Sequence, residues 1–146
     1  MLIRKIEYTD LPNILDIYTH LHDNAISDID RDTLTLWHKI INDPNHHIIV
    51  GVIDSTIVAT CVLMIVPNLT NNKKPYALVE NVVTLPAYRN NGYATKILDY
   101  AKNIAIDNKC YKIMLMTGSK KDTTLNFYEQ AGYNRNDKTA FIQWLV

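Results

Sequence analysis

The sequence predicts one mixed α/β domain, and three observations support this prediction. Its 146 residues suit a single domain and are enough to bury a core. Hydrophobic residues make up 47% of the chain and charged residues 21%, which is typical of globular rather than disordered chains. Strand-type and helix-type patterns follow one another as strand, two helices, three strands, helix, strand, helix and strand.

The first two elements are a strand over residues 2–8 and a helix over residues 9–21. Thr9 or Asp10 can cap this helix, and Pro12 suits its first turn. Its apolar residues recur at the spacing of one helical face, namely Leu11, Ile14, Leu15, Tyr18 and Leu21.

A second helix is predicted over residues 30–43, because acidic residues begin it and Pro44 ends it. β-Branched runs at 46–53 and 56–66, separated by Asp-Ser, predict a β-hairpin. Residues 76–85 predict the next strand, after a polar break that follows the hairpin.

A helix is predicted after the polar turn at residues 89–94, and a strand over residues 111–117. The helix has apolar residues at helical spacing, namely Ala94, Ile97, Leu98, Ala101, Ile104 and Ala105. With the strand at 76–85 before it, this is a strand–helix–strand crossover, which should be parallel and right-handed.

The chain is expected to end in a short helix over residues 122–132 and a strand over residues 140–146. Asp122 or Thr123 can cap the helix, and Gly132 can stop it. The final strand is predicted from the apolar run Ala-Phe-Ile-Gln-Trp-Leu-Val.

Charge and hydropathy argue against several classes of partner, although a local basic patch stays open. Lys and Arg total 15, as do Asp and Glu, so the net charge of zero argues against nucleic acid and anionic membranes as partners. The longest apolar stretch, Ile57 to Val66, is strand-sized and interrupted by Thr60, too short to span a membrane. The N-terminus lacks the apolar core of a signal peptide, so we expect a cytoplasmic protein.

The cysteines and histidines do not predict a metal site. Cys61 lies in an apolar strand candidate, where a buried thiol is the simpler interpretation, and a disulfide with Cys110 is not expected in the cytoplasm. The five histidines are at positions 20, 22, 38, 46 and 47. His20 and His22 point apart on their helix, and His46 and His47 face opposite sides of their strand. We therefore expect no bound metal.

The turn Arg89-Asn90-Asn91-Gly92-Tyr93-Ala94 is the candidate binding site. A helix N-terminus leaves backbone N–H groups unpaired and carries partial positive charge, which suits phosphate. Gly92 allows close approach of a ligand to the backbone, and Arg89 adds a fork of donors. By spacing alone an ordinary polar connection is the favoured interpretation, because the turn lacks both a Walker ending and a dinucleotide fingerprint.

The segment "VENVVTLPAYRNNGYATKILDYA" resembles the coenzyme A-binding segment of the GNAT superfamily of N-acetyltransferases. The family pattern is Arg/Gln-x-x-Gly-x-Gly/Ala after a strand and a Pro-x-Tyr/Phe, here Arg89 to Ala94 after Pro86-Ala87-Tyr88. The segments "LNFYEQAGY" and "YTDLPNILDIY" resemble the family's late helix and its first strand–helix junction. The resemblance covers essentially the whole chain, residues 1–146, and implies a single GNAT-like domain with a mostly antiparallel sheet, a splayed strand pair and flanking helices.

The resemblance implies acetyl-coenzyme A as co-substrate. Its pyrophosphate would rest on the backbone amides of the turn, contributed by Asn90, Asn91, Gly92, Tyr93, Ala94 and Thr95. Its pantetheine arm would lie along the preceding strand, with backbone contacts from Val82, Val83 and Thr84. One strand N–H could also stabilise the oxyanion formed when an amine attacks the thioester.

Tyr128 matches the late-helix tyrosine of the family and is expected to serve the leaving thiolate. A thiol has a pKa of ~8.5 and a tyrosine ~10, so a phenol near the sulfur could protonate it or hydrogen-bond to it. The other interpretation is a core aromatic that shares a helical face with Leu125. A buried ring with a wet hydroxyl satisfies both, and the resemblance favours the functional role.

Glu80 is the candidate general base, acting directly or through water. It is a carboxylate inside the apolar strand "ALVENVV", where burying an unpaired charge would cost free energy, so a specific role or partner is expected. By simple alternation it shares a face with Leu78, Val82 and Thr84, whereas Asn81 faces the other way. A salt-bridged or edge-exposed glutamate is an equally weighted alternative.

The chain departs from the family pattern at two positions. Lys121 stands where an asparagine is common, seven residues before the late tyrosine. Two interpretations are open for it, a contact with the coenzyme and a solvated surface position. Asn90 replaces a frequent glycine, which is tolerable if its φ is positive.

The acceptor is expected to be a primary amine of a small molecule or peptide. In the family it binds between the first helices and the central strands, and here acidic residues gather there, namely Asp16, Asp23, Asp28, Asp30 and Asp32. They could attract a cationic amine, although helix capping and solubility explain most of them. Tyr18, His22 and Trp37 could line this site or belong to the core.

Two other functions remain open from sequence. One is a non-catalytic domain that binds or senses acyl-coenzyme A, and the other is a nucleotide-binding regulator that uses the same turn. An enzymatic function is favoured over both, because the chain has Glu80, Tyr128 and the turn from Arg89 to Ala94. The apolar ending "FIQWLV" could pair across a two-fold axis, so a homodimer is possible.

Overall fold

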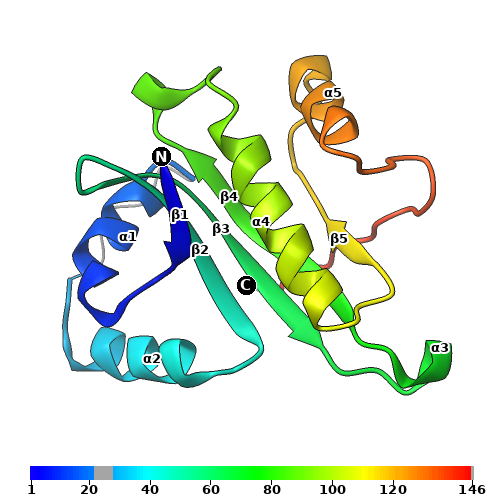
Figure 1. Ribbon diagram of the computed structural model, residues 1–146, viewed down its shortest axis with the longest axis horizontal. Coiled ribbons are helices and arrows are strands. Elements are labelled where there is room, and N and C mark those ends of the chain that lie inside the picture. Colours follow the sequence, from blue (N-terminus) through cyan, green and yellow to red (C-terminus); the bar gives the residue numbers. More distant parts are fainter. Residues whose placement is uncertain (22–27, 146) are drawn as a thin grey trace.

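The protein is a five-stranded sheet covered by helices, seen in a computed structural model that describes residues 1–21 and 28–145 (Figure 1). The strands follow one another across the sheet in chain order: β1 (Leu2–Lys5), β2 (His46–Ile53), β3 (Thr56–Val66), β4 (Tyr76–Thr84) and β5 (Ile113–Leu115). Neighbouring strands are antiparallel except β4 and β5, which are parallel. The predicted mixed, mostly antiparallel α/β fold is therefore confirmed, as is the parallel crossover.

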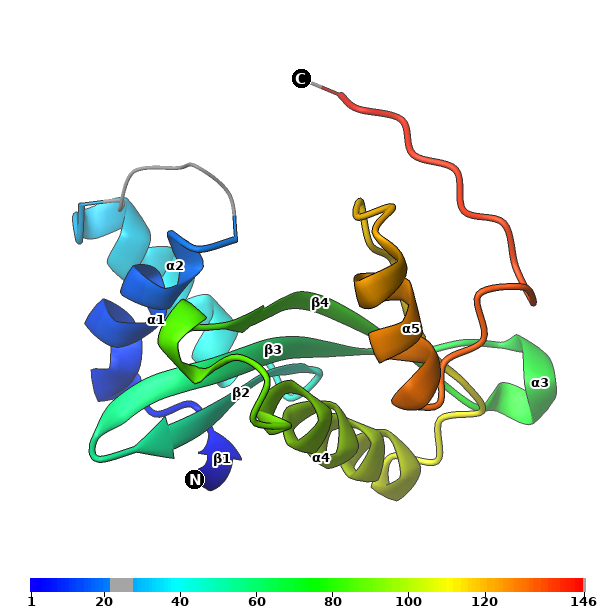
Figure 2. The same ribbon diagram turned by 90° about the horizontal axis from the view of Figure 1, so that it is seen from above.

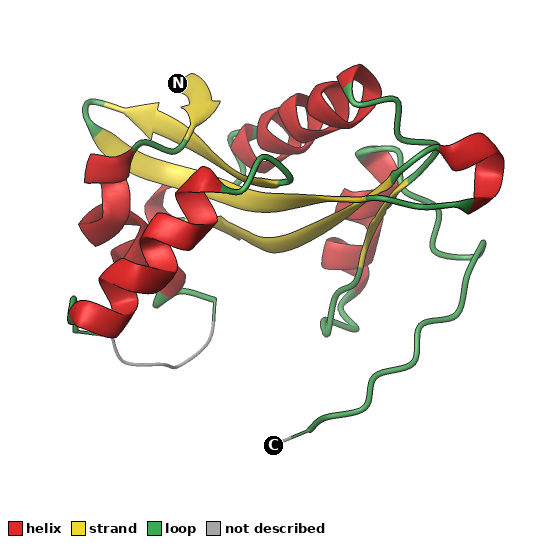
Figure 3. Ribbon diagram, turned by 90° about the horizontal axis from the view of Figure 1, so that it is seen from below, coloured by secondary structure: helices red, strands yellow, loops and turns green. Residues whose placement is uncertain are grey.

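Helices lie on both faces of this sheet (Figure 3). The helical elements are α1 (Leu11–Tyr18), α2 (Arg31–Asn42), α3 (Thr70–Lys73), α4 (Tyr93–Asp107), α5 (Asp122–Gln130) and the 3-10 turns η1 (Tyr8–Asp10) and η2 (Pro86–Tyr88). Viewed along the sheet, α4 covers one face and α1 and α2 cover the other (Figure 2). No described helix is both long and apolar enough to cross a membrane.

The strand side chains alternate between two apolar cores. Ile49 and Leu63 pack with Ile97 of α4 on one face. Val50 packs with Ile14 and Ile17 of α1 on the other. All six side chains are at most 1% exposed, so β2 and β3 are buried on both faces. This explains why they read as nearly unbroken apolar runs rather than as alternating ones.

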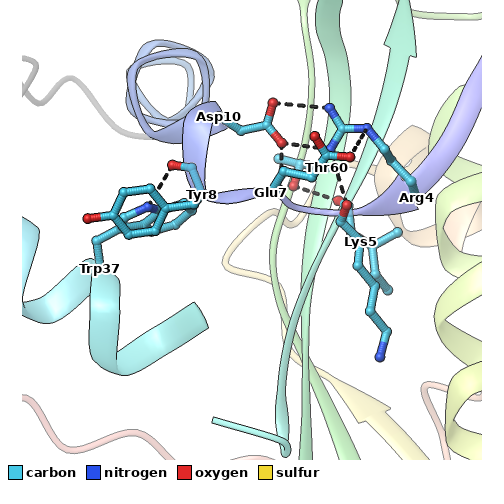
Figure 4. A network of polar contacts seen from close by, with 8 residues as sticks. Arg4, Lys5, Glu7, Tyr8, Asp10, Trp37 and Thr60 are labelled. Atoms are coloured by element: carbon cyan, nitrogen blue, oxygen red, sulfur yellow. Dashed lines mark hydrogen bonds and ion pairs between the residues drawn. The ribbon is translucent and has the colours of Figure 1, made fainter. Parts of the chain in front are cut away.

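A charged network fixes the N-terminal strand to the first helix (Figure 4). The Asp10 carboxylate accepts hydrogen bonds from the Arg4 guanidinium at 2.6 and 3.0 Å and from the Glu7 amide at 2.8 Å. These donors hold the pKa of Asp10 below its usual value, chiefly through Arg4, although burial opposes them. Trp37 of α2 donates its indole N–H to the Tyr8 carbonyl at 3.0 Å. Trp37 is therefore a core residue.

Two helix caps differ from their sequence interpretation. Asp10 is the N-cap residue of α1, but its side chain bonds Arg4 and Glu7 instead of the amides of α1. For α5 the N-cap is Lys121, and Asp122 is the first helical residue. The second helix is capped as expected, because the Asp30 side chain accepts from the Thr33 amide at 2.8 Å.

The predicted C-terminal strand is wrong for the part that the structure describes. Residues 140–145 have no regular secondary structure, and Val146 lies outside the described residues. A strand needs a hydrogen-bonding neighbour, and the described part of the chain places none beside this segment. The strand predicted over 111–117 is likewise shorter, since only Ile113–Leu115 pair with β4.

Candidate active site

The candidate site lies where β4 and β5 separate. Their parallel pairing ends at Val79 and Leu115, so the later residues of β4, Glu80 to Thr84, have no strand partner on that side. Parallel strands end at the same edge of a sheet, which places the turn after β4 and the loop after β5 at one end of the domain (Figure 1). The expected splayed strand pair is present, and the predicted coenzyme segment Val82, Val83 and Thr84 lies in it.

The turn between β4 and α4 is held by its own side chains. Arg89 donates from Nε to the Thr84 carbonyl at 3.1 Å, which ties the turn to the end of β4. Asn91 donates from Nδ2 to the carbonyls of Tyr88 and Arg89 at 3.2 and 2.9 Å. Asn90 has φ +61° and Gly92 has φ +72°, so the positive φ anticipated for Asn90 is confirmed.

The backbone amides from Asn90 to Thr95 have no acceptor among the described residues. The first helical hydrogen bond of α4 comes after them, from the Lys96 amide to the Gly92 carbonyl at 3.2 Å. A Cβ on Gly92 would meet no atom within 4 Å, so the space in front of this backbone is open. A row of free donors at the positive end of a 15-residue helix favours an anionic ligand.

A bulge in β4 places Glu80 on a different face from the one expected. Glu80 lies opposite Val62 and Val83 opposite Thr60, so Asn81 and Val82 together face the single residue Cys61. Asn81 takes φ +51° to make room for the extra residue. Because a one-residue slip exchanges the faces of a strand, Val82 packs on the α4 side, whereas Glu80 shares the α1 and α2 side with its neighbour Val62. The expectation that Glu80 shares a face with Val82 and Thr84 is wrong.

This placement brings Glu80 to the face where the acceptor was expected. The Glu80 side chain is half-buried, and among the described residues its carboxylate has no hydrogen bond or ion pair. The salt-bridged alternative therefore has no support in the described part of the chain.

Tyr18 and Asn81 lie beside this site. The sequence left Tyr18 open between lining the acceptor site and belonging to the core, and it assigned no role to Asn81. The Tyr18 hydroxyl is buried without a hydrogen-bond partner among the described residues. Burial raises its pKa to about 12, an effect that the nearby Asn81 side chain partly offsets. The only sequence signal for Asn81 was its residue type, because β-strands disfavour asparagine and this one lies in a β-branched run.

Tyr128 lies on α5 against the core on the α4 side of the sheet. Its ring is 4.9 Å from that of Phe127 and 6.2 Å from that of Tyr133, measured between centroids. Burial raises the pKa of its hydroxyl, with a smaller contribution from Cys61. The ring is therefore partly core, as the packing interpretation expected, and its phenol stays protonated at neutral pH.

The remaining candidates lie at the rim. Lys121 is exposed at the start of α5, in the loop that follows β5, on the same edge of the sheet as the turn. Of the acidic residues, Asp16, Asp28, Asp30 and Asp32 are exposed, and Asp30 is occupied in capping α2. Asp23 and His22 lie outside the described residues.

Two surface hollows lie apart from this site. One, of about 430 Å3, is lined by Ile65, Pro67, Leu69 and Pro75 at the opposite end of β4 from the turn. The other is lined by residues of β1, α2 and β2, including Ile41 and His47. Neither contains a predicted site residue, so the free amides and not a closed cavity mark the site. No three potential metal ligands gather anywhere in residues 1–21 and 28–145.

Comparison with known proteins agrees with the fold. The profile of the acetyltransferase (GNAT) family matches residues 11–133. A solved protein of Agrobacterium tumefaciens str. C58, assigned as an acetyltransferase, is 33% identical, with 99% of this chain and 100% of that chain covered and a TM-score of 0.91.

Two relatives carry a named substrate. Glucosamine 6-phosphate N-acetyltransferase of Trypanosoma brucei brucei is 25% identical over 93% of this chain and 90% of its own length. The solved glucosamine-6-phosphate N-acetyltransferase of Arabidopsis thaliana shares the fold, with a TM-score of 0.86 at 20% identity over 99% of this chain and 98% of that one. The chain therefore belongs to the acetyltransferase (GNAT) family and is an N-acetyltransferase.

Proposed function

We propose that the protein transfers an acetyl group from acetyl-coenzyme A to a primary amine of a small molecule or peptide, by direct attack in a ternary complex, in the cytoplasm. The observation that supports this most is the row of unpaired amides from Asn90 to Thr95 at the start of α4. These donors, with the open space at Gly92, fit a diphosphate. The unpaired end of β4 fits an amide-bearing arm that adds beside it as a further strand.

In the proposed reaction the amine nitrogen attacks the thioester carbonyl carbon. A C–N bond forms, the C–S bond breaks, and the thiolate leaves. Glu80, through water or directly, takes the proton that the ammonium form of the amine must lose. A free N–H of β4 between Glu80 and Thr84 stabilises the oxyanion.

Tyr128 is proposed to hydrogen-bond to the departing sulfur. Because burial raises its pKa, the phenol remains a donor at neutral pH. A thiol at ~8.5 is more acidic than this phenol, so complete proton transfer from Tyr128 is uphill and the hydrogen bond is the favoured contribution. The nitrogen loses its second proton as the amide forms, and the thiolate takes up a proton through water, so the products are the amide and the free thiol.

Glucosamine 6-phosphate is the first acceptor to test, since it is named for the curated relative. The test is the release of free thiol from acetyl-coenzyme A in the presence of each candidate amine. The candidates are this sugar phosphate, polyamines, aminoglycosides and a peptide with a free N-terminus. We expect turnover with at least one primary amine and a rise in melting temperature with coenzyme A but not with ATP or NAD. A protein that binds no coenzyme A compound would overturn the proposal.

A further inference from the structure

Asn91 and Gly92 form a dipeptide with a spontaneous chemistry of its own. Asn91 is the only asparagine of the chain that a glycine follows. The backbone nitrogen of the following residue can attack the side-chain carbonyl of an asparagine and close a five-membered imide, and a residue without a Cβ hinders this attack least. Asparagine is for this reason among the thermolabile residue types. The sequence therefore singles out Asn91 among the asparagines.

The structure leaves both reacting groups accessible. Asn91 and Gly92 are exposed, in the turn between β4 and α4 (Figure 1). The Gly92 amide has no acceptor among the described residues, so no hydrogen bond has to break to free its nitrogen. Apart from its two chain neighbours, no atom lies within 4 Å of the place of a Cβ on Gly92, so an imide ring has room to form there.

In the resting turn the Asn91 side chain is held in another orientation. Its Nδ2 donates to the carbonyls of Tyr88 and Arg89 at 3.2 and 2.9 Å, which directs the side-chain nitrogen toward residues that precede it. Attack requires the side-chain carbonyl carbon to meet the nitrogen of the residue that follows. Because Asn91 is exposed, water competes for both hydrogen bonds and each adds little stability. Release of the side chain therefore costs little free energy.

We propose that Asn91 is a self-modifying site, at which loss of the side-chain amide abolishes ligand binding by the turn at residues 89–95, and that a bound coenzyme A compound protects it. The Gly92 nitrogen forms a bond with the side-chain carbonyl carbon of Asn91 and gives up its proton, and the side-chain nitrogen leaves as ammonia. Water then opens the imide. Cleavage of the new bond gives aspartate, and cleavage of the original peptide bond gives isoaspartate, in which the chain runs through the side chain.

Either product alters the place where the diphosphate is proposed to bind, so this part of the inference rests on the proposed function. The new carboxylate repels the diphosphate, and it no longer donates to the carbonyls of Tyr88 and Arg89. Isoaspartate also lengthens the backbone just ahead of the free amides of residues 92–95. The domain should stay folded, because a negative charge near the N-terminus of α4 interacts favourably with the helix dipole.

Protection by a ligand follows from the same geometry. A diphosphate on the amides of residues 90–95 occupies the N–H of Gly92 and holds the turn in its resting arrangement. Binding and imide closure therefore exclude each other, so a saturating ligand should slow the reaction in proportion to its occupancy.

Mass spectrometry of protein aged in mildly alkaline buffer is the first test, with the conversion of each asparagine amide to an acid followed on peptides. Asn71 and Asn72 are the internal controls, because both are exposed and have positive φ, +50° and +58°, but neither is followed by glycine. We expect conversion at Asn91 to be faster than at either control. Saturating coenzyme A should slow the conversion at Asn91 and leave that at Asn71 and Asn72 unchanged.

Calorimetric titration of fresh and aged protein with coenzyme A measures the consequence. We expect binding sites to be lost in proportion to the converted fraction of Asn91, with little change in melting temperature. Asn91→Gln keeps an amide but would need a larger ring, so it should keep through ageing the affinity with which it begins. Asn91→Asp should bind coenzyme A about 10-fold or more weakly than the wild type. Asn103→Asp, which makes the same change of charge at an exposed residue farther along α4, should leave the affinity unaltered.

Each contrary result refutes a stated part of the inference. Equal conversion at Asn91 and at the two controls would overturn the modification site. Converted protein that keeps its full affinity, or conversion that saturating coenzyme A does not slow, would overturn the link to binding. Fresh protein that binds no coenzyme A compound would refute the proposed function and this link with it, while the conversion rates decide separately whether Asn91 reacts.

Discussion

Gly92→Ala tests the proposed binding role of the turn at residues 89–95 most directly, because the structure separates its effect on folding from its effect on binding. Gly92 has φ +72°, and a side chain there costs about 1–2 kcal/mol of backbone strain. No atom lies within 4 Å of the added Cβ, so there is no steric term within the protein. For a domain of this size the strain corresponds to a fall in melting temperature of roughly 2–8 °C.

The effect on ligand affinity should be larger than the effect on stability. The new methyl group enters the open space in front of the free amides of residues 90–95, where the diphosphate is proposed to bind. Loss of one or two hydrogen bonds to a charged group, each about 1.5–3 kcal/mol, predicts affinity for coenzyme A weaker by roughly 10- to 10⁴-fold. Calorimetric titration with coenzyme A measures this.

Gly132→Ala is the matched control for this experiment. Gly132 also has a positive φ, +94°, and open space at its Cβ, but it lies after α5, away from the turn. It should lose similar stability and keep its affinity for coenzyme A. Equal affinities in Gly92→Ala and Gly132→Ala would refute the assignment of the turn.

Three further substitutions test individual side chains. Tyr128→Phe should lower kcat about 10²-fold with little change in the affinity for coenzyme A, since only the hydroxyl is removed, and an unchanged kcat would exclude its role at the sulfur. Glu80→Gln should lower kcat/KM about 10²-fold at neutral pH and recover at alkaline pH, where the amine arrives deprotonated; full activity at neutral pH would place the base elsewhere. Asp10→Asn should destabilise the fold by about 1.5–3 kcal/mol in denaturant unfolding at neutral pH, because it breaks the bidentate contact with Arg4. The pKa of Asp10 is lowered in the folded state, so its contribution to the free energy of unfolding is complete above pH ~3.9 and is lost as the pH falls through the folded pKa. The difference in stability between the wild type and Asp10→Asn must therefore close in acid.

The sequence alone was sufficient for the elements whose side chains carry a periodic signal. The β2–β3 hairpin was predicted with its observed bounds, because β-branched runs flank an Asp-Ser turn whose two residues take φ +46° and +63°. The turn before α4 was predicted from Arg89 and Gly92 and from the order of the motifs. Local chemistry determines such features, since the residues that make them are neighbours in the chain.

Only the tertiary structure decided which face Glu80 occupies and whether residues 140–145 form a strand. The bulge at Asn81 depends on how β4 pairs with Cys61 of β3, and strand alternation cannot reveal a register shift set by a partner. The C-terminal segment has the residues of a strand but pairs with no strand in the described chain. A strand is completed by its neighbour's hydrogen bonds, so its formation depends on a contact between distant segments that the order of residues does not specify.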